Sequence, residues 1–254
     1  MASPEVLMVT VGAHKTSGRP ELHERTIPLL TYLTSNYSHY RRISNDIALL
    51  RLKKIIMYNE HVLPVCIPES EQEPPDDSMC FAAGWGLTGE KIIKRYYLMR
   101  LILLENGMLS TMLRVVEVRI QPEKACKRHR VSPFNPKTMI CTTGRPTKKG
   151  TCMGDSGGPM VCYVKERFVQ FGVVSWGEEC GDYTVFTNVA YYSPWLKSTM
   201  HKQRISSPVA QKSNRQLATT RLQVTRDPTN DPPMVYAPSW TAPAYAMHFP
   251  VFLG

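Results

Sequence analysis

A serine inside a glycine-rich string is the residue of this sequence best suited to act as a nucleophile. Ser156 lies in Gly-Asp-Ser-Gly-Gly-Pro, residues 154–159. Small residues on both sides allow a substrate backbone to approach, and the N–H groups of Gly154 and Ser156 can converge on an oxyanion. The same residue types also suit an ordinary turn. The motif alone leaves both interpretations open.

A second group with catalytic potential is Asp46, which leads directly into the apolar string Ile47–Leu50. A carboxylate beside a buried strand costs free energy unless another group pairs with it. Asp46 can simply cap a surface turn. It can also orient a catalytic imidazole, as the aspartate of a Ser-His-Asp triad does.

Together these strings resemble the chymotrypsin/trypsin-like serine endopeptidase family. The resemblance rests on Gly-Asp-Ser-Gly-Gly-Pro with Cys152 four residues before the serine, and on Asn-Asp-Ile-Ala-Leu-Leu at 45–50, in the family's order. It implies that Ser156 is the nucleophile, that Asp46 orients the imidazole, and that the N–H groups of Gly154 and Ser156 form the oxyanion hole. It favours the catalytic interpretation of Asp46.

The resemblance covers residues 5–202 and implies an all-β fold. Two six-stranded antiparallel Greek-key barrels would be followed by a C-terminal helix at 191–202, with the first barrel incomplete. We therefore expect a protease domain over 1–202, in which the stretch 91–105 reads as an insertion into a loop. This basic, apolar stretch could also form a helix for a membrane surface or a partner. Residues 203–254 are rich in proline and predict a disordered tail, as on acrosin-like members.

Seven cysteines are scattered singly, without a C-x-x-C pair, which favours disulfides and an oxidising compartment over a metal site. The resemblance implies that Cys66 has no disulfide partner within this chain. In two-chain members the matching cysteine ties the catalytic domain to a light chain, so such a partner is expected here. The implied disulfides are Cys80–Cys162, Cys126–Cys141 and Cys152–Cys180.

The family's catalytic histidine, usually in Ala-Ala-His-Cys, has no counterpart in this sequence. Val-Thr-Val-Gly-Ala-His at 9–14 resembles the strand that follows that histidine. His14 is a superficial candidate, but it lies too close to Asp46 in sequence and no cysteine follows it. The first residues also lack the basic region of a signal peptide. We expect an N-terminally truncated, inactive chain, in which Asp155 lacks its ammonium partner and turns outward or stays zymogen-like.

The resemblance also implies how substrate would be bound. Ser175-Trp176-Gly177 would pair with substrate backbone as an added strand. Gly150 would lie at the base of the primary pocket and Thr184 in its wall. An uncharged, narrowed pocket predicts small or medium apolar residues, while the nearby Lys148 and Lys149 leave an acidic preference open.

Charge and hydropathy set further limits. A net charge of +10 usually reflects charged residues exposed to solvent, but it also permits an anionic glycan as partner. The sequence contains no run of 18 or more apolar residues, so it predicts no membrane span. We expect no metal, no cofactor and no nucleic acid.

Two hypotheses remain: an incomplete, secreted serine endopeptidase that acts on peptides through an acyl-enzyme, or a non-catalytic, protease-like binding module with a basic surface. The chain could also fail to fold independently.

Overall fold

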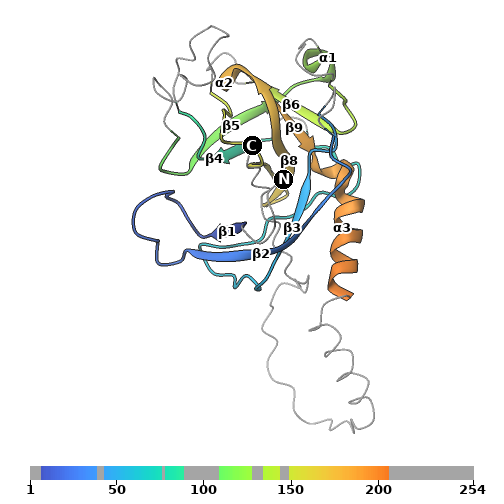
Figure 1. Cartoon of the computed structure of the whole chain (residues 1–254). Helices are drawn as coiled ribbons and strands as arrows, with labels where there is room; N and C mark the ends of the chain where they lie inside the picture. The colour runs from blue at the N-terminus through green and yellow to red at the C-terminus, as the bar shows by residue number, and fades with distance from the viewer. Residues whose placement is uncertain are drawn as a thin grey trace, which may run out of the picture. The chain divides into compact units, whose positions relative to one another are not determined.

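The computed structural model describes residues 7–38, 43–75, 78–88, 109–127, 134–143 and 149–205. Within them lie an open three-stranded sheet, in the order β1-β2-β3, and a closed barrel, in the order β4-β5-β6-β9-β8-β7 (Figure 1). The strands of the open sheet are β1 (Met8–Val11), β2 (Arg25–Thr34) and β3 (Ala48–Leu52).

Six strands form the barrel, and all of their pairings are antiparallel. They are β4 (Cys80–Gly84), β5 (Arg114–Ile120), β6 (Met139–Thr143), β7 (Pro159–Val164), β8 (Arg167–Glu178) and β9 (Tyr183–Asn188). The helices are α1 (Glu123–Cys126), α2 (Glu179–Asp182) and α3 (Val189–Ile205). The expected antiparallel barrel, the incomplete first half and the C-terminal helix are confirmed.

The barrel interior is filled by large side chains from facing strands. Met160, Phe171 and Phe186 are fully buried. A Cβ on Gly172 would lie 2.9 Å from the Cβ of Phe186 and 3.0 Å from that of Met160, so this strand position has room only for glycine. This close packing makes the barrel a rigid support for the loops at its ends.

Three disulfides join the described residues, and they are the pairs that the resemblance implies. Cys80 and Cys162 are register partners on β4 and β7, so their bond links adjacent barrel strands. The other two bonds are Cys126–Cys141 and Cys152–Cys180. Cys66 is a free, half-buried cysteine.

The open sheet is attached to the barrel by backbone hydrogen bonds. Thr16 N–H donates to the Thr111 carbonyl at 3.0 Å, and Lys15 forms an isolated antiparallel bridge with Met112. The chain therefore places the segment before β5 against the loop between β1 and β2.

The expected insertion at 91–105 lies outside the described residues, as does the expected tail from residue 206 onward. The last described residues, 203–205, end α3 instead of starting the tail. A bridge between Leu87 and Leu109 joins described residues on either side of the expected insertion. The chain divides into two compact units, and the second begins at Trp195.

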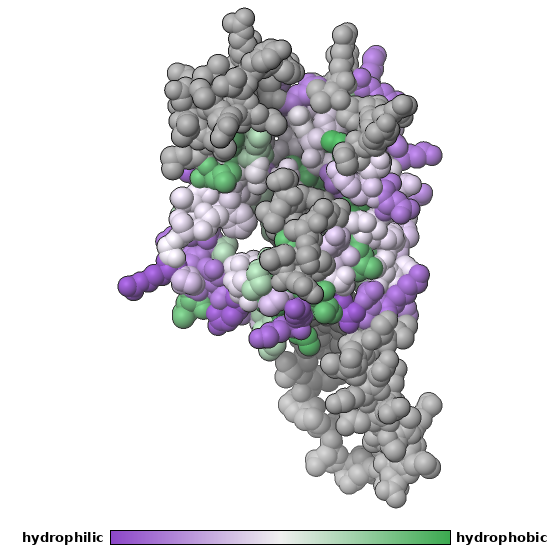
Figure 2. Space-filling view, in the orientation of Figure 1, coloured by the Kyte–Doolittle hydropathy of each residue, from purple (hydrophilic) through white to green (hydrophobic). Residues whose placement is uncertain are grey.

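The surface of the described residues is mixed. In the face drawn in Figure 2, hydrophobic residues appear as separate patches between hydrophilic ones. None of the helices in the described part of the chain has the length and hydropathy needed to cross a membrane.

Candidate active site

Ser156 lies at the exposed tip of a turn between β6 and β7. Gly154 and Gly157 have φ angles of 94° and 82°, a region that L-residues with a side chain rarely adopt. The turn is anchored to the barrel because Gly157 N–H donates to the Val174 carbonyl at 2.8 Å. Within the described ranges, no hydrogen bond engages the Ser156 hydroxyl. The backbone conformation of the turn therefore exposes the serine to solvent.

The carboxylate of Asp155 points into the molecule and is bound by two backbone amides. Gly86 N–H donates to its Oδ1 at 2.7 Å, and Cys152 N–H donates to its Oδ2 at 2.8 Å. A Cβ on Gly86 would lie 2.5 Å from the Asp155 Cγ, so the absence of a side chain there makes room for the carboxylate. Of the two alternatives expected for Asp155, the outward turn is wrong, because backbone N–H groups bind the carboxylate; a zymogen-like arrangement stays a prediction.

Asp46 is held beside β8 and β9 by its own hydrogen bonds. Ser175 donates from Oγ to the Asp46 Oδ2 at 2.5 Å, and Thr187 donates from Oγ1 to the Asp46 carbonyl at 2.7 Å. Burial raises the pKa of Asp46, and the hydrogen bond from Ser175 opposes this shift. The structure thus brings two predicted site residues, Asp46 and Ser175, into direct contact.

Asn45, the residue before Asp46, helps to hold the aspartate in place. Asn45 has a positive φ of 51°, and its Oδ1 accepts a hydrogen bond from the Tyr192 hydroxyl at 2.8 Å. Asparagine is among the residues that tolerate this backbone region best. The string Asn-Asp therefore has a local structural role as well as its predicted role in the site.

His14 makes its hydrogen bonds through its backbone. Its carbonyl accepts from Leu113 N–H at 2.8 Å and from Trp85 Nε1 at 3.2 Å, and its N–H donates to the Glu21 carboxylate. The side chain is exposed. Among the described residues, no contact joins the His14 imidazole to Asp46 or Ser156, so the structure does not bring these three residues together.

The predicted pocket residues lie on segments that meet closely. A Cβ on Gly150 would lie 3.1 Å from the Cα of Gly181. Thr184 is buried, and its Oγ1 lies 2.8 Å from the Oγ1 of Thr151. Thr151 was not among the predicted site residues, although it directly follows Gly150 in the sequence.

The string Ser175–Gly177, predicted to pair with substrate, lies at the end of β8. Trp176 and Gly177 pair with Val185 and Thr184 of β9. The pairing of β8 with β7 ends at Val173. In the described part of the chain, the other edge of β8 beyond Val173 is thus left without a strand partner.

A family model described as Trypsin matches residues 2–196. The chain belongs to the Trypsin family. Human (Homo sapiens) cathepsin G is 30% identical over 198 residues, which are 78% of this chain and 69% of cathepsin G. Granzyme B of Rattus norvegicus is 30% identical over 195 residues, 76% of this chain and 71% of granzyme B.

A third relative, serine protease 56 of Homo sapiens, is 30% identical over 214 residues. That match takes in 82% of this chain but spans only 33% of the length of serine protease 56. Membership of the Trypsin family accounts for the serine turn, the disulfides and the antiparallel barrel together. Within the described residues, no group of three or more His, Cys, Asp or Glu side chains is arranged to hold a metal ion.

Proposed function

We propose that this chain carries the nucleophile, oxyanion-binding and substrate-pairing parts of a serine endopeptidase, and that as it stands it lacks the general base. The observation that carries the proposal is the Ser156 turn. The serine is exposed between two glycines of positive φ, while the neighbouring Asp155 is anchored on backbone amides of Gly86 and Cys152.

The proposed chemistry is acyl transfer. The Ser156 Oγ would form a bond to the carbonyl carbon of a peptide, and an imidazole would take the hydroxyl proton. Collapse of the tetrahedral intermediate would break the C–N bond, and the proton would pass to the leaving amine. Water would then hydrolyse the acyl-enzyme and release the carboxylic acid.

Developing negative charge on the substrate oxygen would be stabilised by the N–H groups of Gly154 and Ser156. In the described part of the chain, neither N–H donates to a backbone or side-chain acceptor. Both donors are therefore available to a ligand. When a triad member is lost, binding and the oxyanion hole leave about 10³–10⁴-fold acceleration over the reaction in water.

Substrate would be held as an added strand along the unpaired edge of β8 at Ser175–Gly177. The Ser175 hydroxyl is occupied by Asp46. The backbone groups of the string would therefore make the contacts to substrate, while the side chain of Ser175 positions Asp46.

The three disulfides support an oxidising compartment, and the proposed enzyme is accordingly a secreted one.

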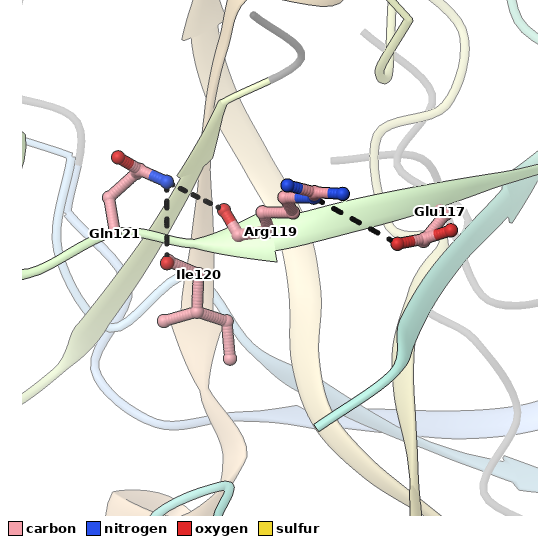
Figure 3. Close-up of polar contacts among 4 residues, drawn as sticks. All are labelled: Glu117, Arg119, Ile120 and Gln121. Atoms are coloured by element: carbon pink, nitrogen blue, oxygen red, sulfur yellow. Dashed lines mark hydrogen bonds and ion pairs between the residues drawn. The ribbon is translucent and has the colours of Figure 1, made fainter. Parts of the chain in front are cut away.

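The alternative, a binding module with a basic surface, finds less support. On β5, Arg119 Nε lies 4.0 Å from a carboxylate oxygen of Glu117, and Gln121 Nε2 donates to the carbonyls of Arg119 and Ile120 (Figure 3). One acid, Glu117, partly offsets the positive charge of Arg119 at this place.

The test uses a fluorophosphonate probe, which phosphorylates an activated serine, with intact mass as readout. The purified chain and its Ser156→Ala variant are labelled with and without added imidazole, which can supply the missing base. We expect slow labelling that imidazole accelerates and that the variant abolishes.

Two outcomes would contradict the proposal. Rapid, stoichiometric labelling without imidazole would show that a base is already present. A folded chain that stays unlabelled even with imidazole would show that the nucleophile and its oxyanion donors are not competent.

A further inference from the structure

The chain between β2 and β3 contains the string Asn36-Tyr37-Ser38. An asparagine followed two residues later by serine or threonine, with no proline between them, is the acceptor pattern for N-linked glycans. No other asparagine of this sequence has serine or threonine at that position. Strings of this kind also arise by chance, so the surroundings of the asparagine decide whether it can serve as an acceptor.

The side chain of Asn36 is exposed and unengaged. The residue has a positive φ of 54°, and its carbonyl accepts a hydrogen bond from Asn45 Nδ2 at 3.1 Å, which fixes its backbone. Within the described ranges, the side-chain amide of Asn36 makes no hydrogen bond. Its Nδ2 is therefore not held by the protein, and a sugar attached to this nitrogen would extend into solvent.

Local structure accounts for the asparagine but not for the serine. Asparagine tolerates positive φ better than most residues, so the turn alone is a reason for Asn36. Ser38 is paired with Ser44 through the backbone only, with N–H···O distances of 3.1 and 2.9 Å. This bridge places no demand on the side chain, and in the described part of the chain the Ser38 hydroxyl makes no hydrogen bond. Acceptor use gives this hydroxyl a role.

The residue between them attaches the string to the protein. Tyr37 is half-buried, and burial together with the negative charge of Asp46 raises the pKa of its hydroxyl. The string is thus held through Tyr37 and through the bond from Asn45, while Asn36 stays exposed. A glycan on Asn36 would occupy the surface near Asp46 without displacing a packed side chain.

We propose that Asn36 is an N-glycosylation site, with an oligosaccharide linked to a polyprenyl diphosphate as donor. The Asn36 Nδ2 forms a bond to the anomeric carbon of the first sugar. The bond from that carbon to the diphosphate oxygen breaks, the polyprenyl diphosphate leaves with the electron pair, and the amide loses one proton to the transferase. The inference rests on the secretory compartment of the proposed function, in which the disulfides also form.

The test is translation of the full chain behind a cleavable secretory leader, in the presence of microsomes that supply the transferase and its donor. We expect a product that is protected from added protease and migrates more slowly than the unmodified chain. Peptide N-glycosidase should restore the faster migration. This enzyme leaves aspartate at the modified position, so the mass of the tryptic peptide should assign the change to Asn36.

Two variants remove different halves of the acceptor. Asn36→Gln and Ser38→Ala should each abolish the gel shift, whereas Ser38→Thr keeps the hydroxyl and should retain it. Ser35→Ala is the matched control, because it removes a neighbouring hydroxyl outside the string and should change nothing. A glycoprotein of known modification, translated in the same microsomes, confirms that the transferase is active.

A protease-protected chain without a glycan would overturn the inference, since import and transferase activity are then both established. A shift that persists in Asn36→Gln would overturn it as well. Ser156→Ala should be glycosylated to the same extent as the native chain. A failure of fluorophosphonate labelling therefore contradicts the proposed function, and a protected but unmodified chain contradicts the acceptor site.

Discussion

The Oγ of Ser175 donates a hydrogen bond of 2.5 Å to the carboxylate of Asp46, a residue 129 positions earlier in the chain. The bond joins the end of β8, in the barrel, to the segment just before β3, in the open sheet. It stabilises the ionised form of a carboxyl group whose pKa is raised by burial.

Replacement of Ser175 by alanine should therefore raise the pKa of Asp46 further and lower the free energy of unfolding by about 1 kcal/mol at neutral pH. Because the folded-state pKa lies above the unfolded one, the loss should be absent where Asp46 is protonated in both states and grow as pH rises through the folded pKa. Urea unfolding at pH 3 and pH 7 measures this. Ser198→Ala, on an exposed position of α3, is the control. An equal loss at both pH values would contradict the assignment.

Gly86 should not tolerate a side chain, because a Cβ there would lie 2.5 Å from the Asp155 Cγ. We expect Gly86→Ala to destabilise the fold by about 1–3 kcal/mol, as overpacking does. The measurement is the urea midpoint. The combination Gly86→Ala/Asp155→Ala removes the clash, so the two effects should be clearly non-additive. Additive losses would show that the carboxylate is not what Gly86 accommodates.

The β7–β8 hairpin closes through Lys165 and Glu166, between the register partners Val164 and Arg167. Both turn residues have positive φ, 47° and 62°, a conformation that suits Asn-Gly far better than Lys-Glu. Glu166→Gly should therefore stabilise the chain by about 0.5–1 kcal/mol after the added entropy of the unfolded glycine is deducted. A thermal melt checks the gain. Glu73→Gly, at an exposed position without positive φ, should produce no gain.

High pH should destabilise the fold through two buried tyrosines, Tyr183 of β9 and Tyr192 of α3. Burial raises the pKa of Tyr183 and of Tyr192 to about 12 from an ordinary value of 10. The unfolded chain then releases these protons first, so the free energy of unfolding should fall as pH rises from 10 to 12, by about 2–3 kcal/mol for each group.

The measurement is urea unfolding at several pH values between 8 and 12. Tyr192→Phe should flatten the fall between pH 10 and 12 by removing one titrating group. Tyr183→Phe should flatten it too. Each variant also loses one hydrogen bond at the pH values where its hydroxyl is protonated, from Tyr183 to the Cys126 carbonyl and from Tyr192 to the Asn45 Oδ1. A slope that neither variant changes would assign the alkaline unfolding to other groups.

The sequence by itself determined those parts of this protein that depend on residues close together in the chain. Gly154, Ser156 and Gly157 lie in one short string, and the backbone conformations they need are local, so the serine turn could be predicted. The barrel strands and the C-terminal helix also follow from short-range patterns and from the resemblance that they carry.

The tertiary structure alone decided the contacts between distant residues. The anchoring of Asp155 on Gly86, the bond from Ser175 to Asp46 and the pairing of Thr151 with Thr184 depend on which strands become neighbours and in which register. A shift of one residue turns a side chain to the opposite face of a sheet. For this reason a linear pattern could single out Thr184 but not its partner Thr151, and could identify Asp155 but not the amides that bind it.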